Sequence, residues 1–165
     1  MTKTKIIKNI SLLKEKLLEE KKKNKKIVFT NGCFDLIHKG HIVLLKKAKS
    51  EGDLLVVAIN SDDSIRKIKG KNRPIFSENE RAEILAAFEF VDFVTIFNEE
   101  NPYKIISELN PDILVKGGDW TVETVIGRDI VEANGGRVVI VPQVKGHSTS
   151  EIIGRIKKVN KGCKN

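Results

Sequence analysis

Apolar and polar residues follow two patterns along the chain, one typical of helices and one typical of strands. Ile6, Ile10, Leu13 and Leu17 recur at helical spacing, which predicts an amphipathic helix over residues 4–22. Ser77 and Glu80 form a capping-box pattern at the start of another helix. In all, the pattern predicts helices at 4–22, 38–50, 77–89, 101–110 with Pro102 at its start, 124–134 closed by Gly135 and Gly136, and 148–158 with Ser148 or Thr149 as its N-cap.

Short apolar runs between these helices predict strands at 27–30, 53–60, 91–97, 112–115 and 137–141. The run at 53–60 is almost continuously apolar, as in a parallel sheet that is covered on both faces. Five alternations of strand and helix predict an α/β domain with a Rossmann-like, doubly wound, five-stranded parallel sheet and helices on both faces. In such sheets the ligand binds beyond the carboxyl ends of the strands, so we expect the site in the loops that follow them.

The charge is concentrated at the two ends of the chain. The formal net charge is +8, but residues 1–26 carry ten lysines and three glutamates, whereas residues 27–156 carry sixteen basic and nineteen acidic residues. The body therefore has no basic excess for a phosphate backbone, and we expect no nucleic-acid partner. We divide the chain into an amphipathic basic helix at 1–24, one α/β domain at 25–158 and a flexible basic tail at 159–165.

Composition excludes several other classes of protein. No apolar run approaches the ~20 residues of a membrane span, and the N-terminus lacks a secretory signal. Cys33 and Cys163 are far apart and suggest no disulfide framework. We expect a reduced, cytoplasmic protein without a membrane partner. The sequence leaves the oligomeric state open and allows a homo-oligomer.

Two of the three histidines lie in one short stretch, TNGCFDLIHKGH, directly after the first predicted strand. His38 and His41 fall at the start of a helix, where backbone N–H groups and the helix dipole favour anions. Two imidazoles aimed at one point would suit a phosphoryl group that gains charge in a transition state. The alternatives are metal ligands or incidental surface residues, but a metal needs further ligands, and the only other histidine is His147.

The stretch resembles the signature of the HxGH nucleotidyltransferases, the cytidylyltransferase-like superfamily. The run Ser148-Thr149-Ser150, at the start of the last helix, is similar to the second motif of that superfamily. The segments VAINSDDSIRKIKGKNRP, SENERAEILAAFEFVDFV, LVKGGDW and EANGGRVVIVP resemble the heptose 1-phosphate adenylyltransferases of lipopolysaccharide-core precursor synthesis. The similarity covers about residues 25–158. In many bacteria this domain is fused behind a sugar kinase, and the chain resembles the stand-alone form.

The resemblance implies transfer of AMP from ATP to a sugar 1-phosphate, D-glycero-β-D-manno-heptose 1-phosphate, giving ADP-heptose and pyrophosphate. It implies His38 and His41 as the catalytic residues. It assigns Mg²⁺ to the ATP phosphates and not to protein side chains. The nucleotide-binding residues that it implies are Thr30, Gly32, Cys33, Phe34, Asp35, Gly40, Arg81, Lys116, Asp119, Ser148, Thr149 and Ser150. The implied substrate-binding residues are Asn60, Ser61, Asp62 and Lys71.

Several of these assignments have a plain structural alternative. Arg81 is otherwise an exposed helix residue, Asp35 a turn cap, and Asn60–Asp62 an ordinary turn. The basic loop with Lys69, Lys71 and Arg73 is either a lid over anionic substrates or a solvated run. Trp120 either stacks on a base or packs in the fold. For Cys33 only the backbone is expected to take part.

The residues alone leave two other functions open. One is a cytidylyltransferase acting on glycerol 3-phosphate or another polyol or amino-alcohol phosphate, because no base-edge contact distinguishes ATP from CTP. The other is a non-catalytic nucleotide-binding module, which would not need to keep both motifs intact. Release of pyrophosphate distinguishes an enzyme from such a module.

Overall fold

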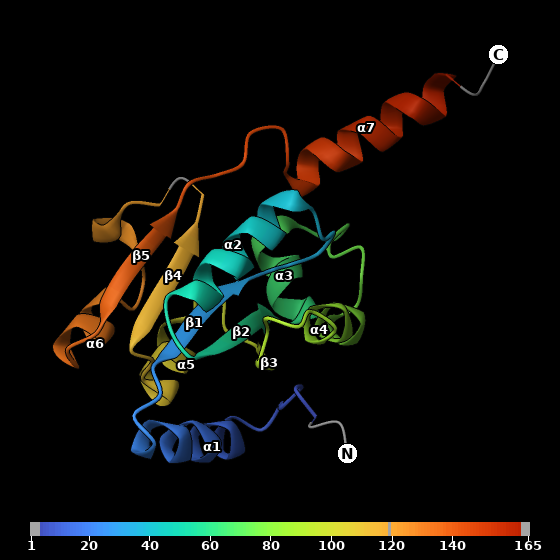
Figure 1. Cartoon of the computed structure of the whole chain (residues 1–165). Coiled ribbons are helices and arrows are strands. Elements are labelled where there is room, and N and C mark those ends of the chain that lie inside the picture. The colour runs from blue at the N-terminus through green and yellow to red at the C-terminus, as the bar shows by residue number, and fades with distance from the viewer. Residues whose placement is uncertain (1–3, 119, 163–165) are drawn as a thin grey trace.

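The computed structural model describes the chain from residue 4 to residue 162, apart from residue 119. Asp119 and Cys163, both considered above, lie outside the described residues. The chain folds into a twisted sheet between two layers of helices, and the C-terminal helix projects away from this body (Figure 1).

The sheet has five parallel strands in the order β3-β2-β1-β4-β5, which confirms the predicted doubly wound topology. Because the chain goes from β1 to β3 on one side and then returns to β4 on the other, the order reverses between β1 and β4. Their carboxyl ends therefore flank the crevice where such sheets bind ligands. The strands are β1 (Ile27–Gly32), β2 (Leu54–Asn60), β3 (Phe93–Phe97), β4 (Ile113–Gly117) and β5 (Arg137–Val141).

Helices cover both faces of the sheet, as the sequence predicted. Leu45 of α2 and Leu85 of α4 are buried on one face, and Leu17 of α1 and Ile106 of α5 on the other. Ser77 and Glu80 form the predicted capping box of α4. The helices are α1 (Ile10–Lys22), α2 (Lys39–Ser50), α3 (Asp62–Lys69), α4 (Glu78–Ala86), α5 (Tyr103–Leu109), the 3₁₀ turn η1 (Val122–Thr124), α6 (Arg128–Ala133) and α7 (Thr149–Gly162).

The N-terminal segment differs from its prediction. Helix α1 begins at Ile10, not at residue 4, and the side chain of Asn9 caps it by accepting a hydrogen bond from the Leu12 N–H. Residues 5–7 instead run alongside β3: the Ile7 N–H donates to the Val94 carbonyl, and the Val94 N–H donates to the Lys5 carbonyl, both at 2.9 Å. The open edge of β3 offers this segment backbone partners, and that pairing overrides the helical spacing of Ile6.

Two further segments differ from the sequence prediction. The sequence predicts no helix between residues 60 and 77, yet α3 forms there with Ser61 as its N-cap. Its apolar content is low, since Ile65 is its only apolar residue in the buried core, and this hid its periodicity. Helix α7 continues to Gly162, so the first part of the expected tail, residues 159–162, is helical.

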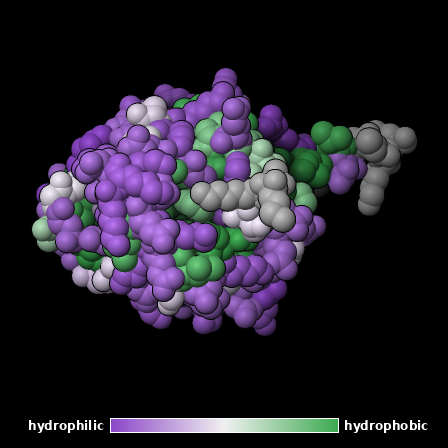
Figure 2. All heavy atoms as spheres, turned by 60° about the horizontal axis from the view of Figure 1, so that its bottom comes forward, coloured by the Kyte–Doolittle hydropathy of each residue, from purple (hydrophilic) through white to green (hydrophobic). Residues whose placement is uncertain are grey.

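The hydrophilic surface seen in Figure 2 is interrupted by hydrophobic atoms in small patches and along the projecting α7.

Candidate active site

A cavity of about 370 Å³ opens at the carboxyl ends of β1, β4 and β5. A cavity therefore lies where the site is expected, beyond the strand ends. The volume of this cavity falls within the usual range for small-molecule sites. Both sequence motifs reach it. His38, Gly40 and His41 line it from the start of α2, and Ser148, Thr149 and Ser150 line it from the start of α7.

The two histidines are stacked on each other inside the cavity. Their ring centroids are 3.8 Å apart with an angle of 22° between the planes, and the Phe34 ring lies 5.0 Å from His41. His38 is the N-cap residue of α2, but its side chain makes no capping hydrogen bond. The Nδ1 atoms of both rings are buried and have no protein partner among the described residues. Buried polar atoms are rarely left unpaired, so these atoms point to a ligand.

Burial keeps both imidazoles neutral. It lowers the pKa of His41 from its ordinary 6.5 to about 4, with smaller contributions from His38 and Lys69. Burial also lowers the pKa of His38, with help from His147. A neutral imidazole donates through only one nitrogen, so each ring offers one N–H to a ligand near pH 7.

Glycines allow this close packing. A Cβ atom at Gly40 would lie 3.0 Å from the His38 ring and 3.2 Å from the His147 carbonyl oxygen. A Cβ at Gly32 would lie 3.2 Å from the Phe34 ring. Phe34 itself adopts a left-handed backbone conformation, with φ of 45°, which produces the sharp turn expected after the first strand.

Three cations reach the cavity: Lys69, Arg73 and Lys116. Lys116 is 7% exposed, its Nζ donates to Asn31 Oδ1 at 2.7 Å, and it lies 5.5 Å from the Trp120 ring centroid. Burial lowers the pKa of Lys116 to about 8. Asn31, at the end of β1, was not singled out from the sequence. Its position in the TNGCF turn, next to Gly32, was the available signal.

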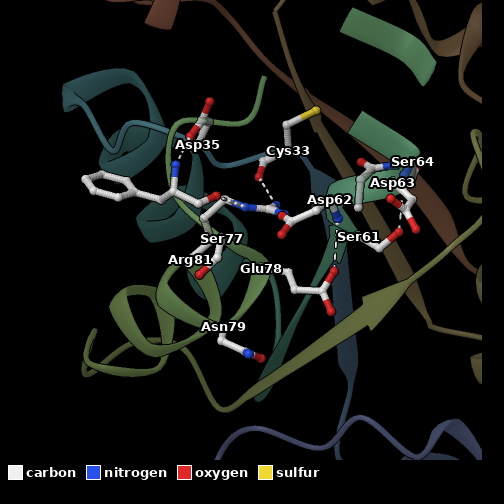
Figure 3. Close-up of polar contacts among 12 residues, drawn as sticks. Cys33, Asp35, Ser61, Asp62, Asp63, Ser64, Ser77, Glu78, Asn79 and Arg81 are labelled. Carbon is white, nitrogen blue, oxygen red and sulfur yellow. Dashed lines mark hydrogen bonds and ion pairs between the residues drawn. The ribbon is translucent and has the colours of Figure 1, made fainter. Parts of the chain in front are cut away.

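Arg81 lies elsewhere than the sequence suggested. It is fully buried, and its guanidinium donates to the Phe76 carbonyl, the Cys33 carbonyl and the Asp62 carboxylate at 3.1, 2.6 and 2.8 Å (Figure 3). All three nitrogens are thus used within the protein, and Arg81 does not line the cavity. Its role is to hold the turn after β1 against the start of α3.

The expected sugar-binding residues also lie outside the cavity. Asn60 is buried and donates to the Ser64 hydroxyl at 3.0 Å, while Ser61 caps α3 and Asp62 pairs with Arg81. These side chains satisfy one another because α3 begins directly after β2. Lys71 is exposed and does not line the cavity, whereas Lys69 and Arg73 of the same segment do.

The remaining expectations divide between the cavity and the core. Thr30 is fully buried in β1 and Asp35 is buried behind the turn, and neither lines the cavity. Gly32, Cys33 and Phe34 do line it. Burial raises the pKa of the Cys33 thiol, so that it stays protonated near neutral pH and is a poor nucleophile. Further lining residues that the sequence analysis did not single out are Leu44, Gly117, Gly118, Val141, Pro142, Gln143 and Val144.

The described residues contain no group of three or more His, Cys, Asp or Glu side chains arranged to hold a metal ion. Nor does any described helix combine the length and apolar character that crossing a bilayer requires.

Comparison with known proteins agrees with the motifs. A family model described as cytidylyltransferase-like matches residues 29–155. The bifunctional protein HldE of Citrifermentans bemidjiense is 53% identical over 150 residues, which cover 91% of this chain and 31% of that protein. HldE of Syntrophotalea carbinolica is 55% identical over 144 residues, covering 87% and 29%. The chain thus spans about a third of the length of these relatives.

Solved structures show the same fold. The lipopolysaccharide core biosynthesis protein from Thermoplasma volcanium is 34% identical, with a TM-score of 0.60 over 73% of this chain and 98% of that one. A pantoate-beta-alanine ligase from Francisella tularensis has a TM-score of 0.63 over 87% of this chain and 68% of its own, at 20% identity. The second similarity concerns the fold alone.

Proposed function

Since the chain belongs to the cytidylyltransferase-like family, we propose that it is an adenylyltransferase that moves AMP from ATP to a sugar 1-phosphate. The stacked pair His38 and His41, which lines one cavity together with Ser148–Ser150, carries this proposal. The proposed acceptor is D-glycero-β-D-manno-heptose 1-phosphate and the product ADP-heptose, a precursor of the lipopolysaccharide core. The sequence identity to the HldE proteins and to the Thermoplasma protein supports this choice of acceptor.

The chemistry needs positioning more than it needs proton transfer. An oxygen of the acceptor phosphate attacks the α-phosphorus of ATP, and the bond from that phosphorus to the oxygen bridging to the β-phosphorus breaks. Pyrophosphate leaves and carries this oxygen with it. Because the attacking oxygen is already anionic near pH 7, no general base is required. Catalysis then consists of aligning the two phosphates and stabilising the charge that shifts between them.

The residues of the cavity suit that task. The neutral imidazoles of His38 and His41 would donate N–H groups to the phosphates, in agreement with their unpaired buried Nδ1 atoms. Hydroxyl and backbone N–H groups at the start of α7, which line the same cavity, would also bind the polyphosphate. The base would lie toward Trp120, whose ring lines the cavity beside Lys116.

Members of nucleotidyltransferase families use a divalent metal with the nucleotide. The polar groups of the cavity are mainly imidazole, hydroxyl, ammonium and guanidinium groups, which fit phosphate oxygens better than they fit Mg²⁺. We therefore assign the metal to the ATP phosphates, where it would neutralise part of their charge. His38, His41 and the α7 turn would hold the phosphates themselves.

A pyrophosphate-release assay tests the function directly. ATP and CTP are each combined with heptose 1-phosphate and with glycerol 3-phosphate, and initial rates are compared at equal concentrations. We expect efficient release only with ATP and heptose 1-phosphate. Faster turnover of CTP with glycerol 3-phosphate would assign the protein to the cytidylyltransferases. Nucleotide binding without release in any combination would make it a binding module.

A further inference from the structure

The segment between α3 and α4 carries an arginine that faces the cavity. Arg73 lines the cavity wall, and its side chain is 15% exposed. Its Nε donates to Asp35 Oδ2 at 2.8 Å. Asp35 comes from the turn after β1, so this ion pair joins two loops that are separated by 38 residues in the sequence.

Asp35 is engaged on all sides by this loop. Its side chain has no exposed area, and its carboxylate also accepts hydrogen bonds from the backbone N–H groups of Ile75 and Phe76, at 2.9 and 3.0 Å. Burial acts to raise the pKa of Asp35. The hydrogen bonds from the Phe76 and Ile75 N–H groups and the interaction with Arg73 together lower it by more, so the pKa lies below its ordinary value. The charged carboxylate therefore fixes both the path of the loop and the orientation of the arginine.

The contact with Asp35 uses only one side of the guanidinium. Among the described residues, no hydrogen bond involves the two terminal nitrogens of Arg73. These nitrogens form the planar fork that matches phosphate oxygens in pairs. Arg81 makes the contrast clear, because all of its nitrogens are bound within the protein.

The surroundings of Arg73 favour an anion. Lys69 lines the same cavity and lies close enough to His41 to lower its pKa. Lys69 and Arg73 also lower the pKa of Cys33, against a larger opposing effect of burial, so both cations lie near the turn after β1. A fixed guanidinium beside a second cation and two neutral imidazoles makes a site for a phosphate group.

We propose that Arg73 binds a phosphate group of the reacting pair through its terminal nitrogens and that Asp35 positions it. This inference rests on the proposed function for the identity of the phosphates. Two sources have the required chemistry, the triphosphate of ATP and the phosphate of the acceptor. In either case Arg73 is a phosphate-binding residue of the site, and Asp35 acts through it.

Binding measurements test this inference without turnover. Calorimetry follows Mg²⁺–ATP titrated into the protein, and then inorganic phosphate titrated into protein saturated with a non-hydrolysable ATP analogue. The variants are Arg73→Gln, Arg73→Lys and the control Lys67→Gln, an exposed lysine of α3 that does not line the cavity. Arg73→Gln should raise one dissociation constant by roughly tenfold or more, as loss of a charged hydrogen-bonding partner does. Arg73→Lys should raise it less, and the control should match the wild type.

The two titrations separate the sources. Weaker ATP binding identifies the triphosphate as the ligand of Arg73, and weaker phosphate binding identifies the acceptor. A folded Arg73→Gln protein with both constants within twofold of wild type would overturn the inference. Failure of the proposed function would look different: the wild type would bind ATP but release no pyrophosphate with heptose 1-phosphate. Both titrations could still be interpreted in that case, because they measure binding and not turnover.

The positioning role of Asp35 needs a double variant. If Asp35 acts through Arg73, Asp35→Asn should raise the affected constant by roughly tenfold in the wild-type background and by less than twofold in the Arg73→Gln background. Equal effects in both backgrounds would show a merely structural role. Where Asp35→Asn does not fold, Arg73→Lys gives the second measurement: a dissociation constant for the lysine variant that is clearly above the wild-type value supports the need for the oriented fork, and wild-type affinity refutes it.

Discussion

His41 should make the protein less stable in mild acid, and its replacement by glutamine should remove most of that loss. In the folded protein burial lowers its pKa from 6.5 to about 4, whereas in the unfolded chain the ordinary value applies. Above pH 6.5 the imidazole is neutral in both states. Between pH 6.5 and 4 the unfolded chain takes up a proton that the folded protein refuses, so the free energy of unfolding falls as the pH falls.

The size of the effect follows from the displacement of the pKa. Each tenfold change in proton affinity is worth about 1.4 kcal/mol, so the full displacement corresponds to about 3 kcal/mol. Between pH 7 and pH 4.5 the wild type should therefore lose about 2 kcal/mol through His41 alone, once partial exposure to solvent is allowed for. His41→Gln cannot take up a proton, so its stability should fall less over the same range.

Urea unfolding at pH 7, 6, 5 and 4.5 measures this directly. Cys33→Ser is a suitable control because it alters the same cavity without changing a group that titrates in this range. The control should follow the wild type, and the His41→Gln curve should be flatter by about 2 kcal/mol. Parallel curves for wild type and His41→Gln would refute the reasoning, because they would mean that His41 is as free to protonate in the fold as in the unfolded chain.

Three other predictions concern turnover and stability. His38→Ala should cut turnover by roughly 10²-fold with the fold intact, as expected for loss of one preorganised donor; near-normal turnover at saturating substrate would exclude its catalytic role. Cys33→Ser should keep its activity because only the backbone is needed, and complete loss in a folded, ATP-binding protein would instead indicate covalent thiol catalysis. Leu17→Ala should lower the free energy of unfolding by about 2–5 kcal/mol, since this side chain is 1% exposed in the core; urea unfolding and ATP titration test it, and a change in ATP affinity with no change in stability would contradict it.

The predictable parts of the structure are those that local chemistry determines. The capping box of α4 follows from Ser77 and Glu80, and the sheet topology follows from five alternating segments. The histidines could be placed because a strand end and a helix start meet at one turn. In each case residues close in sequence determine the result.

The sequence could not show which way polar side chains point. Arg81 and Asp62 are 19 residues apart and bind each other, and neither lines the cavity. Arg73 and Lys71 are two residues apart in one basic loop, yet only Arg73 turns inward, because buried Asp35 holds it. Such choices depend on partners that are distant in the sequence, and a single chain gives no signal for them.

The short segment at residues 5–7 covers part of the outer edge of β3. An edge strand presents unpaired backbone groups that can recruit a strand from another chain. Lys5 and Ile7 occupy the backbone groups of Val94 on β3, and the Lys5 side chain extends to the Phe88 carbonyl at 2.8 Å. Shortening the N-terminus past these residues would therefore expose the unpaired backbone edge of β3 and remove part of the core. The shortened protein should be prone to aggregate even where it still folds.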